Sequence, residues 1–187
     1  MAKIFRRYKS TIYGNYRKAY LTDGLLTGIA MSLVLLLRDC MGDIPMRQPE
    51  NFVTELVLAI GIFLFGYLYR KELPRGKVTF KELMLLGLGI GVVSAIAFGL
   101  WVWLYCGVID TNMVFYYNRQ RVCMMEPAEA SAEARAAREL VMKYTAGDWG
   151  FIAGFRSAVM SIIIAFCAAL IYRTEKSPVM EKKEKEK

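Results

Sequence analysis

The sequence contains no histidine, which removes the commonest general base and the commonest metal ligand of proteins. This absence excludes any nucleophile that depends on a Ser-His or Cys-His pair. The four cysteines, Cys40, Cys106, Cys123 and Cys167, include no Cys-x-x-Cys pair, so a thiol-redox or zinc-ribbon site has little support. We therefore expect a protein that is not an enzyme, with no catalytic residues, no cofactor and no metal site.

Apolar residues are abundant: they make up 56% of the 187 residues, with a mean hydropathy of +0.30. Soluble domains are usually about 45–50% apolar. The excess lies in four blocks, each longer than the roughly 10–14 residues of a buried soluble helix. They predict an all-α fold, an integral membrane four-helix bundle forming a single domain over residues 1–187, with spans at about 21–37, 52–69, 83–109 and 149–172.

The net charge of +8 comes from basic residues that flank the apolar blocks. This arrangement indicates membrane orientation rather than a nucleic-acid partner. Lys and Arg are most frequent in the N-terminal segment, in the second connection and in the C-terminal tail, and an even number of spans places all three on one side. The positive-inside rule then predicts that both termini are cytoplasmic.

Residues 126–144, between the third and fourth spans, differ in kind from the spans. Pro127 suits a first helical position, alanine dominates after it, and acidic residues precede basic ones as the helix dipole favours. We expect one additional extramembrane helix here. The alternating Lys and Glu at about 178–187 predict a disordered tail.

Small residues recur at four-residue spacing within three spans, a pattern that lets helix backbones approach closely in lipid. An intrachain seam is the favoured interpretation, ahead of a homodimer seam or a substrate path. These helix-packing ridges contain Gly24 and Gly28 in the first span, Gly87, Gly91, Ala95 and Gly99 in the third, and Ser157, Ser161, Ala165 and Ala169 in the fourth.

Arg156 is the most unusual residue, because it lies well inside the fourth span, where a charge costs about 2.5–3.5 kcal/mol on insertion scales. Glu55 lies at a comparable level of the second span. We predict an intramembrane Glu55–Arg156 ion pair that fixes helix register, with ligand or ion handling as the less favoured role.

Other acidic and sulfur groups give weaker signals. Asp23 and Glu82 each begin a span on the predicted inner side, where the helix dipole explains them, although together they could bind a cation. Thr79 and Glu82 have the spacing of a capping box. Cys40 and Cys106 both fall near the predicted outer face, and the sequence leaves open whether they are bonded.

Several short motifs in order resemble the bacterial domain-of-unknown-function family 4199, found mainly in Bacteroidetes. They are Gly-Lys-Val-Thr-Phe-Lys-Glu at 76–82, Tyr-Cys-Gly-Val-Ile-Asp at 105–110, the helix near 127–144, and a final span with a basic tail. The similarity covers about residues 21–173, and Thr111 stands where that family often has a proline. The resemblance implies four helices and an inner-membrane location, with no established activity and so no catalytic residues.

Two functions fit these features, and a membrane enzyme is the least favoured third, because Asp23, Glu82 and Asp110 are not clustered in the sequence. The first is a non-enzymatic subunit or scaffold of an envelope complex, whose partners are the lipid bilayer and other membrane proteins or further copies of itself. The alternative is a small transporter or channel-like oligomer for a lipid-linked or amphipathic substrate. No span is broken by proline in the way that transporter spans often are, which favours the first.

Overall fold

The computed structural model describes residues 16–40, 52–72, 78–125 and 131–173, and within these segments the chain is helical with no strand. The elements are α2 (Tyr16–Cys40), α3 (Phe52–Glu72), α4 (Phe80–Leu104), the π-helical turn η1 (Tyr105–Ile109), α5 (Asn112–Cys123), α6 (Ala132–Met142) and α7 (Ala146–Tyr172). The all-α membrane bundle predicted from the sequence is confirmed.

Four of these helices are long and apolar enough to cross a membrane: Ala19–Arg38, Phe52–Lys71, Phe80–Ile109 and Ala146–Tyr172. At about 1.5 Å per residue, each reaches or exceeds the roughly 30 Å thickness of the hydrocarbon core. The third and fourth are longer than the blocks read from the sequence, because polar residues of their first turns extend the helix without being apolar themselves.

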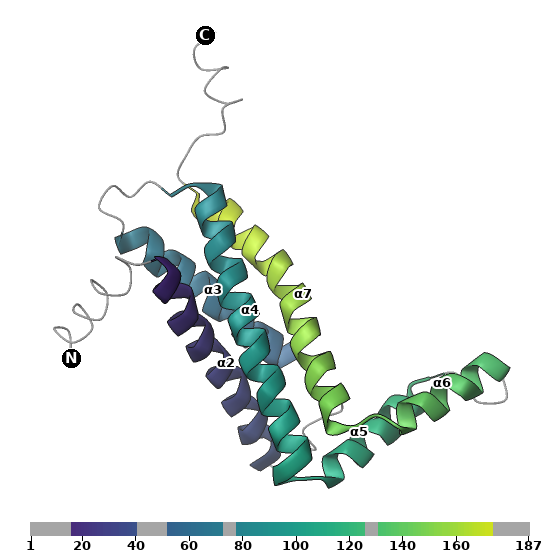
Figure 1. Ribbon diagram of the computed structural model, residues 1–187. Helices are drawn as coiled ribbons and strands as arrows, with labels where there is room; N and C mark the ends of the chain where they lie inside the picture. The colour runs from purple at the N-terminus through teal and green to yellow at the C-terminus, as the bar shows by residue number, and fades with distance from the viewer. Residues whose placement is uncertain (1–15, 41–51, 73–77, 126–130, 174–187) are drawn as a thin grey trace.

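Helix α4 is the centre of the bundle. It packs against α7 on one side and against α2 on the other, and α3 lies behind it and contacts the other three long helices (Figure 1). Half of its most apolar window is buried, more than in any of the other three spans. The glycine-rich composition of α4 follows from this position, because a helix enclosed by neighbours needs small residues on several faces.

Helix α4 begins where the sequence predicts a cap. Thr79 Oγ1 accepts from the Glu82 backbone N–H at 3.2 Å, and the Glu82 carboxylate accepts from the Thr79 backbone N–H at 3.0 Å. This is the predicted capping box. Helix α7 begins with a second capping box, between Thr145 and Asp148, which was not predicted from the sequence.

The described part of the connection between α4 and α7 contains two α-helices, whereas the sequence predicts one. The chain leaves α4 through the π turn, where the Asp110 N–H donates to the Tyr105 carbonyl, and α5 follows at once. Helix α5 went unrecognised because its polar and apolar residues follow no clear helical period. We call the pair α5–α6 the arm; it extends sideways from one end of the bundle, across the direction of α4 and α7 (Figure 1).

Helix α6 begins at Ala132 and ends at Met142, inside the predicted 126–144 helix. Its N-cap is Ser131, whose hydroxyl accepts from the Ala134 N–H at 3.0 Å. Pro127, expected at the first helical position, lies outside the described residues, and so does the tail at 178–187.

Candidate functional site: the faces of the central helix

The seam between α4 and α7 is made of small residues that leave no space for larger ones. A methyl group added to Gly87 would lie 2.7 Å from Ala165 Cβ, and one added to Gly91 would overlap Ser161. Towards the arm, the same substitution at Gly99 would come within 2.8 Å of the Gly150 carbonyl. The ridges of the third and fourth spans therefore face each other within one chain.

The opposite face of α4 receives the ridge of α2 in the same manner. A methyl group on Gly24 would meet Val93, and one on Gly28 would lie 2.7 Å from Ala97 Cβ. At this contact the buried Ser94 hydroxyl is 2.9 Å from the Gly24 carbonyl oxygen and 2.7 Å from the Ile90 carbonyl oxygen. Small residues therefore form the contact of α4 with α7 and the contact of α4 with α2, and both contacts lie within one chain.

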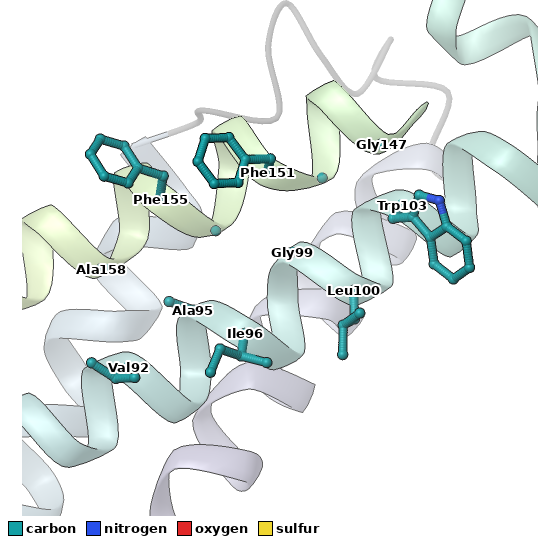
Figure 2. A pocket seen from close by; sticks show the side chains of 12 residues that line it. Val92, Ala95, Ile96, Gly99, Leu100, Trp103, Gly147, Phe151, Phe155 and Ala158 are labelled. Atoms are coloured by element: carbon teal, nitrogen blue, oxygen red, sulfur yellow. The ribbon is translucent and has the colours of Figure 1, made fainter. Parts of the chain in front are cut away.

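The α4–α7 seam opens outwards into an apolar groove of about 410 Å³ near the arm. We call it the α4–α7 groove. Figure 2 shows Val92, Ile96 and Leu100 along α4, and the neighbouring rings of Phe151 and Phe155 on α7. The two rings are stacked, with centroids 5.8 Å apart. Small residues line the groove between these walls: Ala95, Gly99, Gly147, Gly150, Gly154 and Ala158.

A second groove of about 490 Å³ lies on the other side of α4, against α2. Leu100 and Trp103 line both grooves, so they form a ridge between them. Ile96 and Leu100 are 59% and 58% exposed although they are apolar. This face of the bundle, with an apolar ridge between two apolar grooves, has the form into which another helix can pack.

The predicted ion pair is present: Arg156 Nε lies 2.6 Å from Glu55 Oε1. Glu55 is 12% exposed and Arg156 is 38% exposed, so the pair lies at the edge of the α3–α7 contact. At this position the carboxylate compensates a charge that would otherwise face hydrocarbon. The pair joins α3 to α7 at one level of both helices, which is the geometry expected of a register-fixing interaction.

Asp23 and Glu82 do not form a common cation site. Glu82 is exposed and engaged in its capping box, while Asp23 is 2% exposed inside the bundle. The Asp23 Oδ2 atom has no hydrogen-bond partner among the described residues. Within those residues, no three His, Cys, Asp or Glu side chains are grouped as a metal ion requires.

The cysteines of the described residues are free thiols. Cys106 is buried within η1, whereas Cys40 is exposed at the end of α2. The question that the sequence left open is therefore answered against a Cys40–Cys106 bond.

The arm is joined to the bundle by a buried polar network that we call the elbow. The Trp149 indole N–H donates to Asn118 Oδ1 at 2.8 Å, and Asn118 Nδ2 donates to the carbonyls of Met142 and Tyr144 at 3.3 and 2.9 Å. The rings of Tyr117 and Tyr144 pack on Trp149, with centroids 5.2 and 6.0 Å away. Three helices are thus held together by one amide whose hydrogen-bonding capacity is largely used.

The residues of the elbow and the α7 glycines of the α4–α7 groove were not predicted from the sequence. Gly150, Gly154 and Ala158 have a four-residue spacing of their own, offset by one residue from the Ser157–Ala169 ridge, so a search for a second small-residue row on α7 would have found them. For Asn118 and Trp149, which are 31 residues apart, no local signal exists.

A bundle of four apolar helices with one extramembrane helical hairpin places this chain among small multi-pass membrane proteins. Residues 22–174 match the model of the family described as protein of unknown function DUF4199, and the chain belongs to that family. No curated protein and no solved structure matches it. The resemblance stated from short motifs is therefore confirmed.

Proposed function

We propose that this protein is a non-enzymatic subunit or scaffold of a bacterial envelope complex, and that the α4–α7 groove is where a transmembrane helix of its partner packs. The main support is the form of the groove. Its small residues allow close backbone approach, and its walls are apolar side chains exposed on the surface of a membrane-spanning bundle.

The groove suits a helix better than a small polar ligand. The two grooves and the ridge between them run along α4, so a partner helix could lie beside the ridge over several turns. Helices associate in lipid through van der Waals packing at small residues, since burial of apolar surface offers little gain there. The α4–α7 contact within the chain already uses this mode of packing.

The proposed location is the inner membrane, with both termini in the cytoplasm and the arm on the opposite side. The distribution of Lys and Arg along the sequence supports this orientation, because the three most basic segments are separated from one another by even numbers of spans. The lack of histidine supports a non-enzymatic role.

Site-specific photocrosslinking in native membranes tests the proposal. A benzophenone amino acid replaces Phe155 in the groove wall or, as a control, Ile163, which is 58% exposed on the same helix but outside the groove. We expect the Phe155 position to give one discrete protein adduct and the Ile163 position to give none. Mass spectrometry then identifies the partner.

A groove-filling variant makes the test specific. Ala158→Phe places a ring in the groove and should abolish the Phe155 adduct while leaving the amount of protein in the membrane unchanged. Adducts formed equally from both positions, or with lipid alone, would contradict the proposal. An adduct at twice the mass of the chain would identify the partner as a second copy.

Transport is the second candidate, and the observation in its favour is the buried Asp23 oxygen without a partner. Intramembrane carboxylates often belong to ion or proton pathways. Proteoliposomes with an internal pH-sensitive dye test this role. Proton flux that is lost in Asp23→Asn would favour transport over the scaffold.

A further inference from the structure

The arm contains a hollow of about 750 Å³ between α5 and α6, which we call the arm hollow. It differs from the two grooves on α4, because charged side chains dominate its lining. Four cations surround it, Arg119 from α5 and Arg135, Arg138 and Lys143 from α6 and its C-cap, with one acid, Glu139.

This excess of positive charge favours an anionic ligand. Like charges gathered around one hollow repel each other unless an anion lies among them, and the described lining of the hollow has one acid, Glu139, beside four basic side chains. Arginine side chains bind phosphate oxygens through two parallel hydrogen bonds, a geometry that lysine does not offer. Three of the four cations are arginines, so the set matches a phosphate group.

Membrane orientation does not account for these cations. They lie in the connection that the charge distribution assigns to the side opposite the termini, where the positive-inside rule gives basic residues no advantage. Binding of an anionic ligand would explain these basic residues, whereas membrane orientation does not.

The remaining lining of the arm hollow is apolar. Phe115 and Val122 from α5 and Met142 from α6 line the same space as the cations. Phe115 is 58% exposed. A ligand with both a charged and an apolar part would therefore satisfy the hollow better than a free anion would.

The arm also lies where such a ligand is found. Helix α5 begins three residues after the third span ends at Ile109, and Lys143 is three residues before α7 begins. The arm runs across the direction of the spans (Figure 1), as a hairpin at a membrane surface would. Both ends of the hairpin are therefore close to the level of the lipid headgroups.

We propose that the arm hollow binds the phosphate headgroup of an anionic membrane lipid, with the apolar side chains against the start of its acyl chains. The arginines bind the phosphate, and Lys143 adds a point charge at the side nearer the bundle. This inference is independent of the proposed partner helix, because the α4–α7 groove and the arm hollow share no residue.

Native mass spectrometry of the full chain in detergent measures the binding. Dioleoyl phosphatidylglycerol is the probe, and dioleoyl phosphatidylcholine, which has the phosphate without net charge, is the comparison. We expect the anionic lipid to bind at least about tenfold more tightly, and Arg135→Gln/Arg138→Gln to lose about tenfold of that affinity. A second pair, Arg119→Gln/Lys143→Gln, repeats the test from both helices.

Arg121→Gln is the matched control, since Arg121 lies on α5 outside the lining of the hollow. Its affinity for the anionic lipid should stay within about twofold of the wild type, because only diffuse attraction changes. An equal loss in this control, or equal binding of the two lipids, would overturn the proposal. Displacement of the lipid by excess inorganic phosphate would assign the hollow to a soluble anion and overturn it as well.

Discussion

The α4–α7 seam and the elbow join helices in opposite ways. At the seam, Gly91 and Ser161 bring two backbones together, and the contact depends on the absence of side-chain volume. At the elbow, large aromatic rings surround Asn118, and the contact depends on hydrogen bonds. The seam lies within the membrane-spanning part and the elbow lies at its end.

The difference reflects the solvent around each contact. In hydrocarbon, burial of apolar side chains brings little gain, so packing of small residues holds the helices together. At the interface, water competes for polar groups, and a buried, satisfied network with aromatic burial fixes one geometry for the arm. Substitutions that remove space should therefore damage the seam, and substitutions that remove hydrogen bonds should damage the elbow.

The largest effect is expected at the seam. Gly91→Ala adds a methyl group that overlaps Ser161, so the stability of the protein in detergent should fall by about 3 kcal/mol. Thermal unfolding followed by circular dichroism measures the loss. Ser161→Gly in the same chain should restore part of it.

Gly66 provides the matched control for this substitution. A methyl group there would meet Tyr172 at an ordinary 3.5 Å, and alanine is the better helix former by up to about 1 kcal/mol. Gly66→Ala should therefore be neutral or stabilising. If Gly91→Ala were as stable as the wild type, the seam would have room for the methyl group, contrary to the close approach of Gly91 and Ser161.

The next effect is expected at the elbow. Asn118→Ala leaves the Trp149 N–H and two carbonyls without their partner, at a cost of about 2 kcal/mol. Spin labels on α6 and α2 would report a broader distance distribution between arm and bundle. Asn112→Ala, at an exposed position of α5, should change stability by less than about 0.5 kcal/mol. A distance distribution as narrow as that of the wild type would show that the network does not orient the arm.

A smaller effect is expected at the ion pair, which is partly exposed. Arg156→Leu leaves Glu55 without this partner and should cost about 1–2 kcal/mol, and Glu55→Leu should behave similarly. The double variant should be more stable than either single variant, because no charge is left unpaired. Strictly additive losses in a double-mutant cycle would show that the two charges do not stabilise each other.

The smallest effect, opposite in sign, is expected at Asp23. Asp23→Asn removes a buried carboxylate with an unpartnered oxygen, so stability should rise by less than about 1 kcal/mol. Glu82→Gln, which preserves a capping box at an exposed position, should leave stability unchanged. A clear loss of stability in Asp23→Asn would indicate that the carboxylate has a bound partner in the membrane.

Much of the spanning part could be predicted from the sequence, because its signals are local. Four apolar blocks predict the helices, Thr79 and Glu82 predict the start of α4, and the four-residue spacing of small residues predicts a seam. The Glu55–Arg156 pair could be inferred across 101 residues because two charges at one depth of the membrane have few other partners.

The arm could not be predicted to the same degree. The apolar residues of helix α5 do not recur with a helical period, so the sequence contains no signal for this helix. In the structure, Tyr117 and Asn118 of α5 contact Trp149 of α7, and these tertiary contacts hold the helix in place. The arm hollow requires Arg119 and Arg135 to meet from different helices, and no sequence pattern gives that distance. Propensity is a weak signal where such contacts decide the structure.

By itself, the sequence determined that the chain has four membrane helices and which helix faces carry small residues. A helix must be long and apolar to cross the hydrocarbon core, and helices can approach closely only where their side chains are small. Only the tertiary structure decided which ridge meets which, that α4 is the central helix, and that two further helices form an arm. The physical reason is that helix formation depends on neighbours along the chain, whereas grooves, hollows and the elbow arise from residues that folding brings together.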